Sequence, residues 1–169
     1  MMRRIIKIIQ NRIIKWILVI GCMLSIFAMS HLDSVKSWYM TGKVLTTIEQ
    51  TTDETSDLDY SEEIQYYSAK ESAMLILRKS AHVIEYFVLF LLLFNALYKP
   101  SSLRNNMVIA SVIAVVYAVL DEIHQLFVPG RSGTVLDVLT DSLGVFMGCL
   151  AILVVVKLNS KKKEKTQVT

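Results

Sequence analysis

Four apolar runs, each long enough to cross a lipid bilayer as an α-helix, constrain this chain more than any other feature of its sequence. A spanning helix needs about 20 mostly apolar residues. The runs cover residues 13–32, 80–98, 107–128 and 138–156. The mean hydropathy of the chain is +0.47, and most charged residues lie between or beside the runs. The sequence therefore predicts an all-α polytopic membrane helix bundle with about four transmembrane helices.

Lysine and arginine in the flanking segments predict the orientation of these helices, because short cytoplasmic loops carry an excess of both residues. Basic residues gather before the first run, between the second and third runs, and after the fourth. The segment 33–71 instead holds nine acidic residues and three lysines. We therefore predict a basic cytoplasmic N-terminus at residues 1–12 and a basic cytoplasmic tail at residues 158–169. The transmembrane domain, residues 13–157, then includes an acidic extracytoplasmic loop at residues 33–78.

The first apolar run has two alternative interpretations. Ala28-Met29-Ser30 resembles a signal-peptide cleavage site, and Val19-Ile20-Gly21-Cys22 superficially resembles a lipoprotein box. The apolar stretch between Lys15 and Cys22 is short for the roughly 7–15 apolar residues that a signal sequence needs. An uncleaved helix fits better than a signal peptide, because the whole run is long enough to span. Cys22 and Cys149 both lie inside apolar runs, so we interpret them as small buried residues.

Polar side chains gather at one predicted depth, at the outer ends of the last three spans. At 1.5 Å per residue, all lie within roughly 10 Å of the outer boundary. Charged residues cost about 2.5–3.5 kcal/mol each at a helix centre, so those within spans usually indicate function. The predicted polar pocket comprises Lys79, His82, Glu85, Tyr86, Asp121, Glu122, His124, Gln125, Arg131, Asp137 and Asp141.

These residues allow a structural and a functional interpretation. In the structural one, Lys79 and Arg131 neutralise neighbouring carboxylates and hold the bundle together. In the functional one, the pocket opens to the outer surface and receives a polar head group or a proton. Gly144 and Gly148 lie one helical turn apart, so we predict that they form a small-residue surface for close helix packing.

Two residue pairs raise the hypothesis of a metal site. His82 with Glu85, and Asp121 with His124, each have the i, i+3 spacing of carboxylate–histidine ligation in helix bundles. Either histidine can equally bond a neighbouring carboxylate, and the sequence has no zinc spacing, P-loop or dinucleotide fingerprint. We therefore predict no metal, no cofactor and no nucleic-acid partner.

Two segments, RKSAHVIEYFVLFLLL and YAVLDEIHQLFVPGRSGTVLDVLTDSLGVFMG, closely resemble the VanZ-like family. Ser30, Ser34 and Ser37 weakly resemble the family's serine-bearing opening, and Asp141 stands where the family often has asparagine. The resemblance covers residues 16–156 apart from the acidic loop, and it implies a multi-pass plasma-membrane protein. Its motif matches Lys79, His82, Tyr86, Asp121, Glu122, Gln125, Pro129, Gly130, Arg131, Asp137 and Gly144.

Founding members of that family are linked to reduced susceptibility to glycopeptide antibiotics, notably teicoplanin. The resemblance therefore implies an envelope protein that binds a lipid or glycopeptide-type head group, with membrane lipids as partners. One alternative is a membrane enzyme whose His82 and carboxylates act as acid and base on a lipid-linked substrate. A second alternative is a small proton-coupled transporter, although the sequence lacks the inverted repeat of many transporters.

Overall fold

The computed structural model of the chain describes residues 12–31, 60–100, 102–129, 131 and 133–167. Within these residues every regular element is an α-helix, which confirms the predicted all-α class. The basic N-terminus and most of the acidic loop, with Ser34 and Ser37, lie outside the described residues. The helices are α2 (Arg12–His31), α4 (Tyr60–Leu97), α5 (Leu103–Gln125) and α6 (Val135–Gln167).

Each helix contains a segment long and apolar enough to cross a membrane. The four segments are Arg12–His31, Leu75–Leu97, Leu103–Gln125 and Val135–Ser160. This confirms a bundle of four candidate spans. The apolar run 107–128 extends past the end of α5, because residues 126–129 form a turn that contains Pro129. α4 extends well before the second apolar run, since the helix begins at Tyr60.

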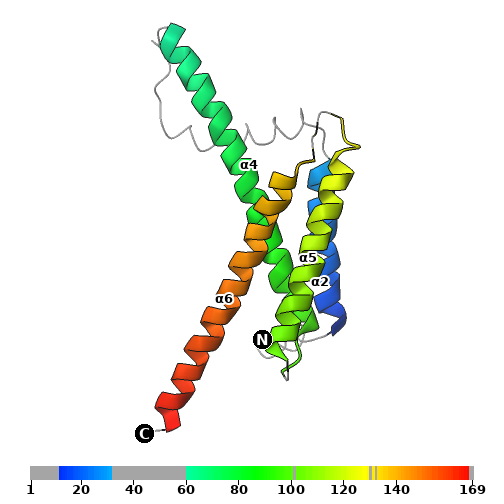
Figure 1. The fold of residues 1–169 in the computed structure, drawn as a ribbon, viewed down its shortest axis with the longest axis vertical. Helices are drawn as coiled ribbons and strands as arrows, with labels where there is room; N and C mark the ends of the chain where they lie inside the picture. Colours follow the sequence, from blue (N-terminus) through cyan, green and yellow to red (C-terminus); the bar gives the residue numbers. More distant parts are fainter. Residues whose placement is uncertain (1–11, 32–59, 101, 130, 132, 168–169) are drawn as a thin grey trace, which may run out of the picture.

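α4 contacts each of the other three helices, and α4 and α6 cross and share the most extensive interface (Figure 1). α5 also packs against α6, while the contact between α2 and α5 is less extensive than the contact of either helix with α4. The N-terminal part of α4 and the C-terminal part of α6 extend beyond the bundle in opposite directions. The turn after α5 leads into α6, so the ends of α2 and α5 lie near the beginning of α6.

The core consists of apolar side chains at helical spacing. On α4 it contains Tyr86, Leu89, Phe90 and Leu93, all at most 1% exposed. On α5 it contains three alanines, four residues apart, that are completely buried. Such small side chains allow neighbouring helices to approach closely. The buried residues of α5 that are apolar are Ala110, Ala114 and Ala118.

Gly144 is a point of close approach between α6 and α4. A Cβ atom there would overlap the carbonyl oxygen of Val83 and lie 2.9 Å from the backbone nitrogen of Phe87. A Cβ atom at Gly148 would overlap the ring of Phe90. Both glycines thus lie in the interface with α4, and this contact fixes the height of α6 relative to α4.

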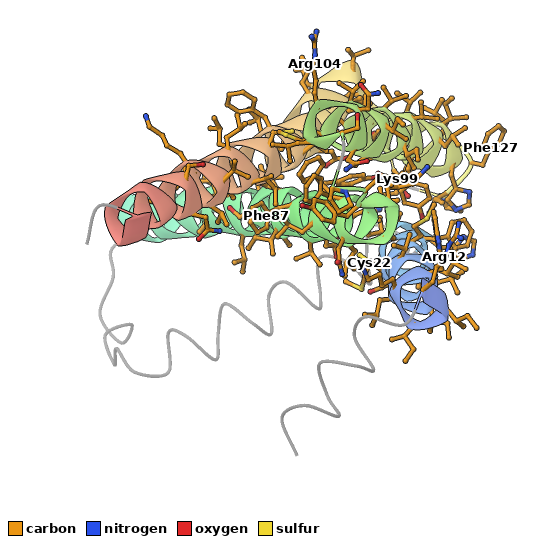
Figure 2. All side chains as sticks on the ribbon, turned by 90° about the horizontal axis from the view of Figure 1, so that it is seen from below. Arg12, Cys22, Phe87, Lys99, Arg104 and Phe127 are labelled. Atoms are coloured by element: carbon orange, nitrogen blue, oxygen red, sulfur yellow. The ribbon has the colours of Figure 1, made fainter. Side chains whose placement is uncertain are left out.

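Large apolar side chains also cover the outside of the bundle. Figure 2 shows side chains projecting from all the helices, with Phe127 at the periphery, and Phe127 is 81% exposed. Ile17, Val112 and Leu143 are each more than half exposed within their helices. Exposure of this kind is expected where lipid, not water, surrounds a helix.

Candidate functional site

The predicted polar residues gather at the end of the bundle where α2 and α5 end and α6 begins. We call this set the polar cluster; it draws side chains from all four helices. Its buried members are at most 7% exposed, and they lie on the faces that point into the bundle. These members are Ser30, Tyr86, Asp121, Glu122, Gln125 and Asp141.

Asp121 forms the main link between α2 and α5. The Ser30 hydroxyl donates to Oδ2 of Asp121 at 2.6 Å, and Nε2 of Gln125 donates to the same oxygen at 3.0 Å. Gln125 Nε2 also lies 3.2 Å from Oε1 of Glu122. The side chains at 121, 122 and 125 meet because positions three and four apart are neighbours on a helix.

Glu122 connects the end of α5 to the beginning of α6. Its Oε2 accepts a hydrogen bond from the backbone N–H of Thr134 at 3.0 Å. A Cβ atom at Gly133 would overlap the carbonyl oxygen of Glu122, so only glycine lets the chain pass this close. The carboxylate therefore fixes the return of the chain into α6.

Asp137 has two roles at the beginning of α6. Its backbone N–H donates to Oγ1 of Thr134 at 3.2 Å, and its carboxylate accepts from that hydroxyl at 2.8 Å, which caps the helix. Its Oδ1 also lies 3.1 Å from Nζ of Lys79. Both partners are partly exposed, so this ion pair lies at the rim of the polar cluster.

Three further side chains of α4, those of Arg78, His82 and Glu85, lie close to the same rim. Nδ1 of His82 is 3.5 Å from Oε2 of Glu85, a distance that allows an ion pair but is long for a hydrogen bond. Arg78 interacts electrostatically with Asp137 and Glu122. The polar cluster thus combines cations on α4 with carboxylates on α5 and α6.

Of the buried polar atoms within the described residues that have no hydrogen-bond partner, three come from three different helices. They are the hydroxyl of Tyr86, Oδ1 of Asp121 and Oδ2 of Asp141. Tyr86 interacts electrostatically with both carboxylates, so the three groups form one neighbourhood across α4, α5 and α6. An unpaired buried polar group costs about 1–3 kcal/mol, which makes these atoms candidates for contact with a ligand.

Arg131 lies in the turn between α5 and α6. Its Nη2 donates to the backbone carbonyl of Met29 at 3.2 Å, in the last turn of α2. This contact with α2 was not among the sequence-based expectations for Arg131. It ties the turn to α2, where carbonyls at a helix C-terminus attract a positive charge.

His124 packs against the last turns of α2. Its Nε2 lies 3.2 Å from Nδ1 of His31 on α2, and Phe27 stacks against both rings. The ring of His124 therefore contacts two side chains of α2. Within the described residues, no three His, Cys, Asp or Glu side chains are grouped in a way that could hold a metal ion.

Sequence reasoning had not assigned Arg78 or His31 to the site, and had connected Ser30 to it only through a weak resemblance. A signal was nevertheless present for the two residues on α2. Ser30 and His31 end the first apolar run, so they share the depth of the residues at the ends of the other runs. Arg78 directly precedes Lys79, so the same argument from depth applies to it.

Comparison with known proteins gives one family. The sequence profile described as VanZ/LLP1 matches residues 15–156. No curated protein and no solved structure matches the chain. The matched residues contain the second and third candidate spans, most of the first, the fourth up to residue 156, and every member of the polar cluster.

Proposed function

This chain belongs to the VanZ/LLP1 family, and from that premise we propose that it binds a polar head group in the cell-envelope membrane. The ligand class is a membrane lipid or a glycopeptide-type molecule with a lipid anchor. The binding site is the polar cluster, which we place at the outer leaflet of the plasma membrane on the basis of the basic flanking segments. A head group there meets cations from α4 and carboxylates from α5 and α6.

The observation that carries this proposal is the set of unpaired polar atoms on Tyr86, Asp121 and Asp141. These atoms are buried, and they come from three different helices. Hydroxyl and amide groups of a sugar or peptide can donate to the two carboxylate oxygens, and they can accept from the tyrosine hydroxyl. A ligand of this kind would satisfy atoms that the described part of the protein leaves without partners.

The rim of the polar cluster supports entry from the membrane surface. Lys79 is 52% exposed, and its partner Asp137 is 32% exposed. A surface ion pair contributes only about 0–1 kcal/mol, so a charged ligand can displace either partner at little cost. We further propose that binding lowers susceptibility to teicoplanin-like antibiotics, in keeping with the family to which the chain belongs.

A membrane enzyme is the second candidate function, and the pair His82–Glu85 favours it. This pair lies on the same helix as Tyr86, one turn or less away, and Glu85 interacts electrostatically with Asp121. An imidazole and a carboxylate near buried groups can act as acid and base on a lipid-linked substrate. Comparison of lipid extracts from a deletion strain and its parent separates the two functions: a missing modified lipid indicates the enzyme.

The variant Tyr86→Phe tests the binding function most directly. It removes one unpaired hydroxyl and leaves the buried ring in place, so the fold should persist. We expect a deletion strain that carries Tyr86→Phe to be more susceptible to teicoplanin than one that carries the natural chain, at equal membrane abundance. The measurement is the minimum inhibitory concentration, with an unrelated cell-wall inhibitor as the drug control.

Tyr98→Phe is the matched control, because Tyr98 is 49% exposed and follows the far end of α4. It should behave as the natural chain. Equal susceptibility of the deletion strain and its parent would reject the link to antibiotics. Equal function of Tyr86→Phe and Tyr98→Phe, in a strain where the deletion has an effect, would reject the role of the polar cluster.

A further inference from the structure

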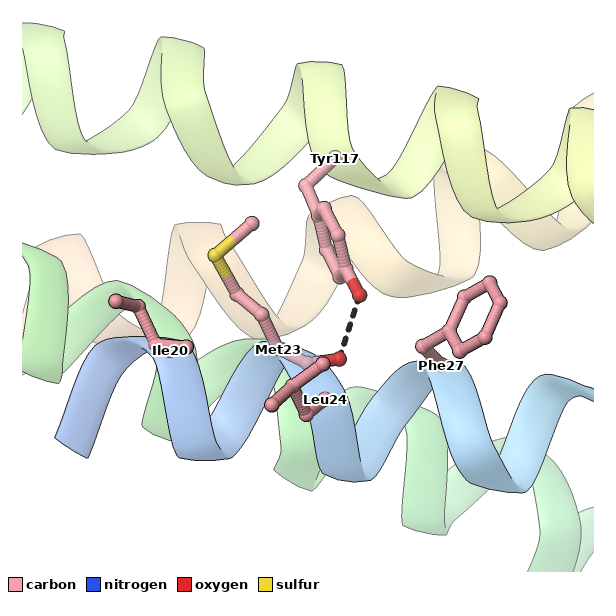
Figure 3. Close-up of a pocket in the computed structure, with 5 residues that line it drawn as sticks. All are labelled: Ile20, Met23, Leu24, Phe27 and Tyr117. Carbon is pink, nitrogen blue, oxygen red and sulfur yellow. Dashed lines mark hydrogen bonds between the residues drawn. The ribbon is translucent and has the colours of Figure 1, made fainter. Parts of the chain in front are cut away.

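A groove runs between α2 and α5 on the outside of the bundle. It has a volume of about 400 Å³ and is lined by Ile20, Met23, Leu24 and Phe27 of α2 and by Tyr117 of α5. Figure 3 shows these side chains between the two helices, with Tyr117 reaching toward α2. The volume lies within the range of about 300–1,000 Å³ that is usual for small-molecule sites.

The lining of the groove is apolar, although it contains a tyrosine. The hydroxyl of Tyr117 donates to the backbone carbonyl of Met23 at 2.6 Å, so its polar atom is already used between the helices. Ile20 and Leu24 are each more than half exposed. Ile20 and Leu24 lie within the membrane-spanning segment of α2, where no water is available and lipid chains fill surface grooves.

One end of the groove leads directly to polar groups. Phe27 lines the groove and also stacks on His31 and His124, with ring centroids 5.9 and 4.6 Å away. Both histidines lie in the last turns of their membrane-spanning segments, at the depth of lipid head groups. Arg131 contributes a positive charge at this end, since it donates to the Met29 carbonyl two residues before His31.

We propose that this groove binds one anionic phospholipid, with an acyl chain along α2 and α5 and its phosphate at the two histidines. An apolar groove that ends at two imidazoles and a guanidinium matches the chemistry of such a lipid. Imidazole N–H groups and arginine donate hydrogen bonds to phosphate oxygens. The site faces the membrane, whereas Ser30 and Asp121 of the polar cluster face the bundle interior. The site shares His124 and Arg131 with the polar cluster, but it uses none of the unpaired atoms of Tyr86, Asp121 and Asp141. The proposal therefore does not depend on the proposed function.

The test uses the purified full chain in nanodiscs that contain a photoreactive phosphatidylglycerol with a diazirine on its acyl chain. Mass spectrometry then locates the labelled residues. We expect labelling to concentrate on the groove residues of α2 and α5. The variant Leu24→Trp fills the groove and should remove most of this labelling. Its matched control is Leu18→Trp, because Leu18 is 45% exposed on the same helix but does not line the groove.

The head-group part of the proposal has its own test. The double variant His31→Phe with His124→Phe keeps an aromatic stack and removes the ring nitrogens. We expect it to reduce the preference for phosphatidylglycerol over phosphatidylcholine of equal chain length by roughly tenfold, the effect of losing one hydrogen bond to a charged group. Circular dichroism should show unchanged helix content in every variant.

Three results would overturn the proposal. Labelling spread evenly around α2 would reject a specific groove, as would equal labelling of Leu24→Trp and Leu18→Trp. A natural chain that labels equally with both head groups would reject the anionic lipid. None of these results would change the susceptibility of Tyr86→Phe, so failure here is distinguishable from failure of the proposed function.

Discussion

The hydroxyl of Ser30 lies 2.6 Å from Oδ2 of Asp121, and this hydrogen bond joins α2 to α5 inside the bundle. Both side chains are at most 3% exposed. The bond connects the first apolar run to the polar cluster. It also holds Oδ2 of Asp121, while Oδ1 has no hydrogen-bond partner within the described residues.

Ser30→Ala should therefore loosen α2 from the rest of the bundle. The loss of a hydrogen bond to a charged group is worth about 1.5–3 kcal/mol, and interhelical bonds in membranes often contribute less. We expect a lower midpoint of thermal unfolding in detergent, followed by circular dichroism. Ser25→Ala is the control, since Ser25 is exposed on the same helix. Equal midpoints for the two variants would contradict the role of this bond.

Gly144→Ala should separate α6 from α4. The added methyl group overlaps the carbonyl oxygen of Val83, and backbone atoms cannot move aside as a flexible side chain can. Overpacking typically costs about 1–3 kcal/mol, so we expect reduced thermal stability and reduced membrane abundance. Gly21→Ala is the control, because nothing lies within 4 Å of a Cβ atom there. A Gly144→Ala variant as stable as Gly21→Ala would show that this contact is not required.

The depth of the candidate site could be predicted from sequence, because apolar run length fixes where each helix meets the membrane surface. This is why Lys79, Asp121 and Asp141 were assigned to one end of the bundle, where the structure also has them. Depth alone would also have included Ser30 and His31, which end the first apolar run.

The rotation of each helix could not be predicted in the same way. The contacts of His124 with Phe27 and His31 of α2 could not be predicted from the spacing of residues within α5. In a membrane both the lipid-facing and the buried faces are apolar, so periodicity distinguishes them weakly. The contact of Arg131 with the Met29 carbonyl could not be predicted either, because it joins a turn to a backbone atom of another helix.

The orientation of the bundle remains a prediction from basic residues, and reporter fusions test it. Fusions after Thr51 and Ser132 should report the extracytoplasmic side, while fusions after Ser102 and Lys163 should report the cytoplasm. The alternation follows from four crossings, so a single inconsistent fusion would indicate a different number of spans. A cytoplasmic signal after Thr51 with the opposite signal after Ser102 would place the polar cluster at the inner face.

Asp141→Asn should stabilise the protein. Asp141 is 2% exposed, and within the described residues its Oδ2 has no hydrogen-bond partner. Asparagine has nearly the same shape, so packing should be retained. Its amide N–H groups can donate to the neighbouring carboxylates of Asp121 and Glu122, with which Asp141 interacts electrostatically.

Replacing one of three adjacent acidic groups by a donor should raise stability by about 1–2 kcal/mol, the scale of satisfying a buried polar group. The measurement is again the midpoint of thermal unfolding in detergent. Asp137→Asn is the matched control: it loses the ion pair with Lys79 and weakens the cap of α6, so its midpoint should stay level or fall. If Asp141→Asn lowers the midpoint as much as Asp137→Asn does, the carboxylate of Asp141 is a structural bond acceptor, and its unpaired oxygen cannot be assigned to a ligand.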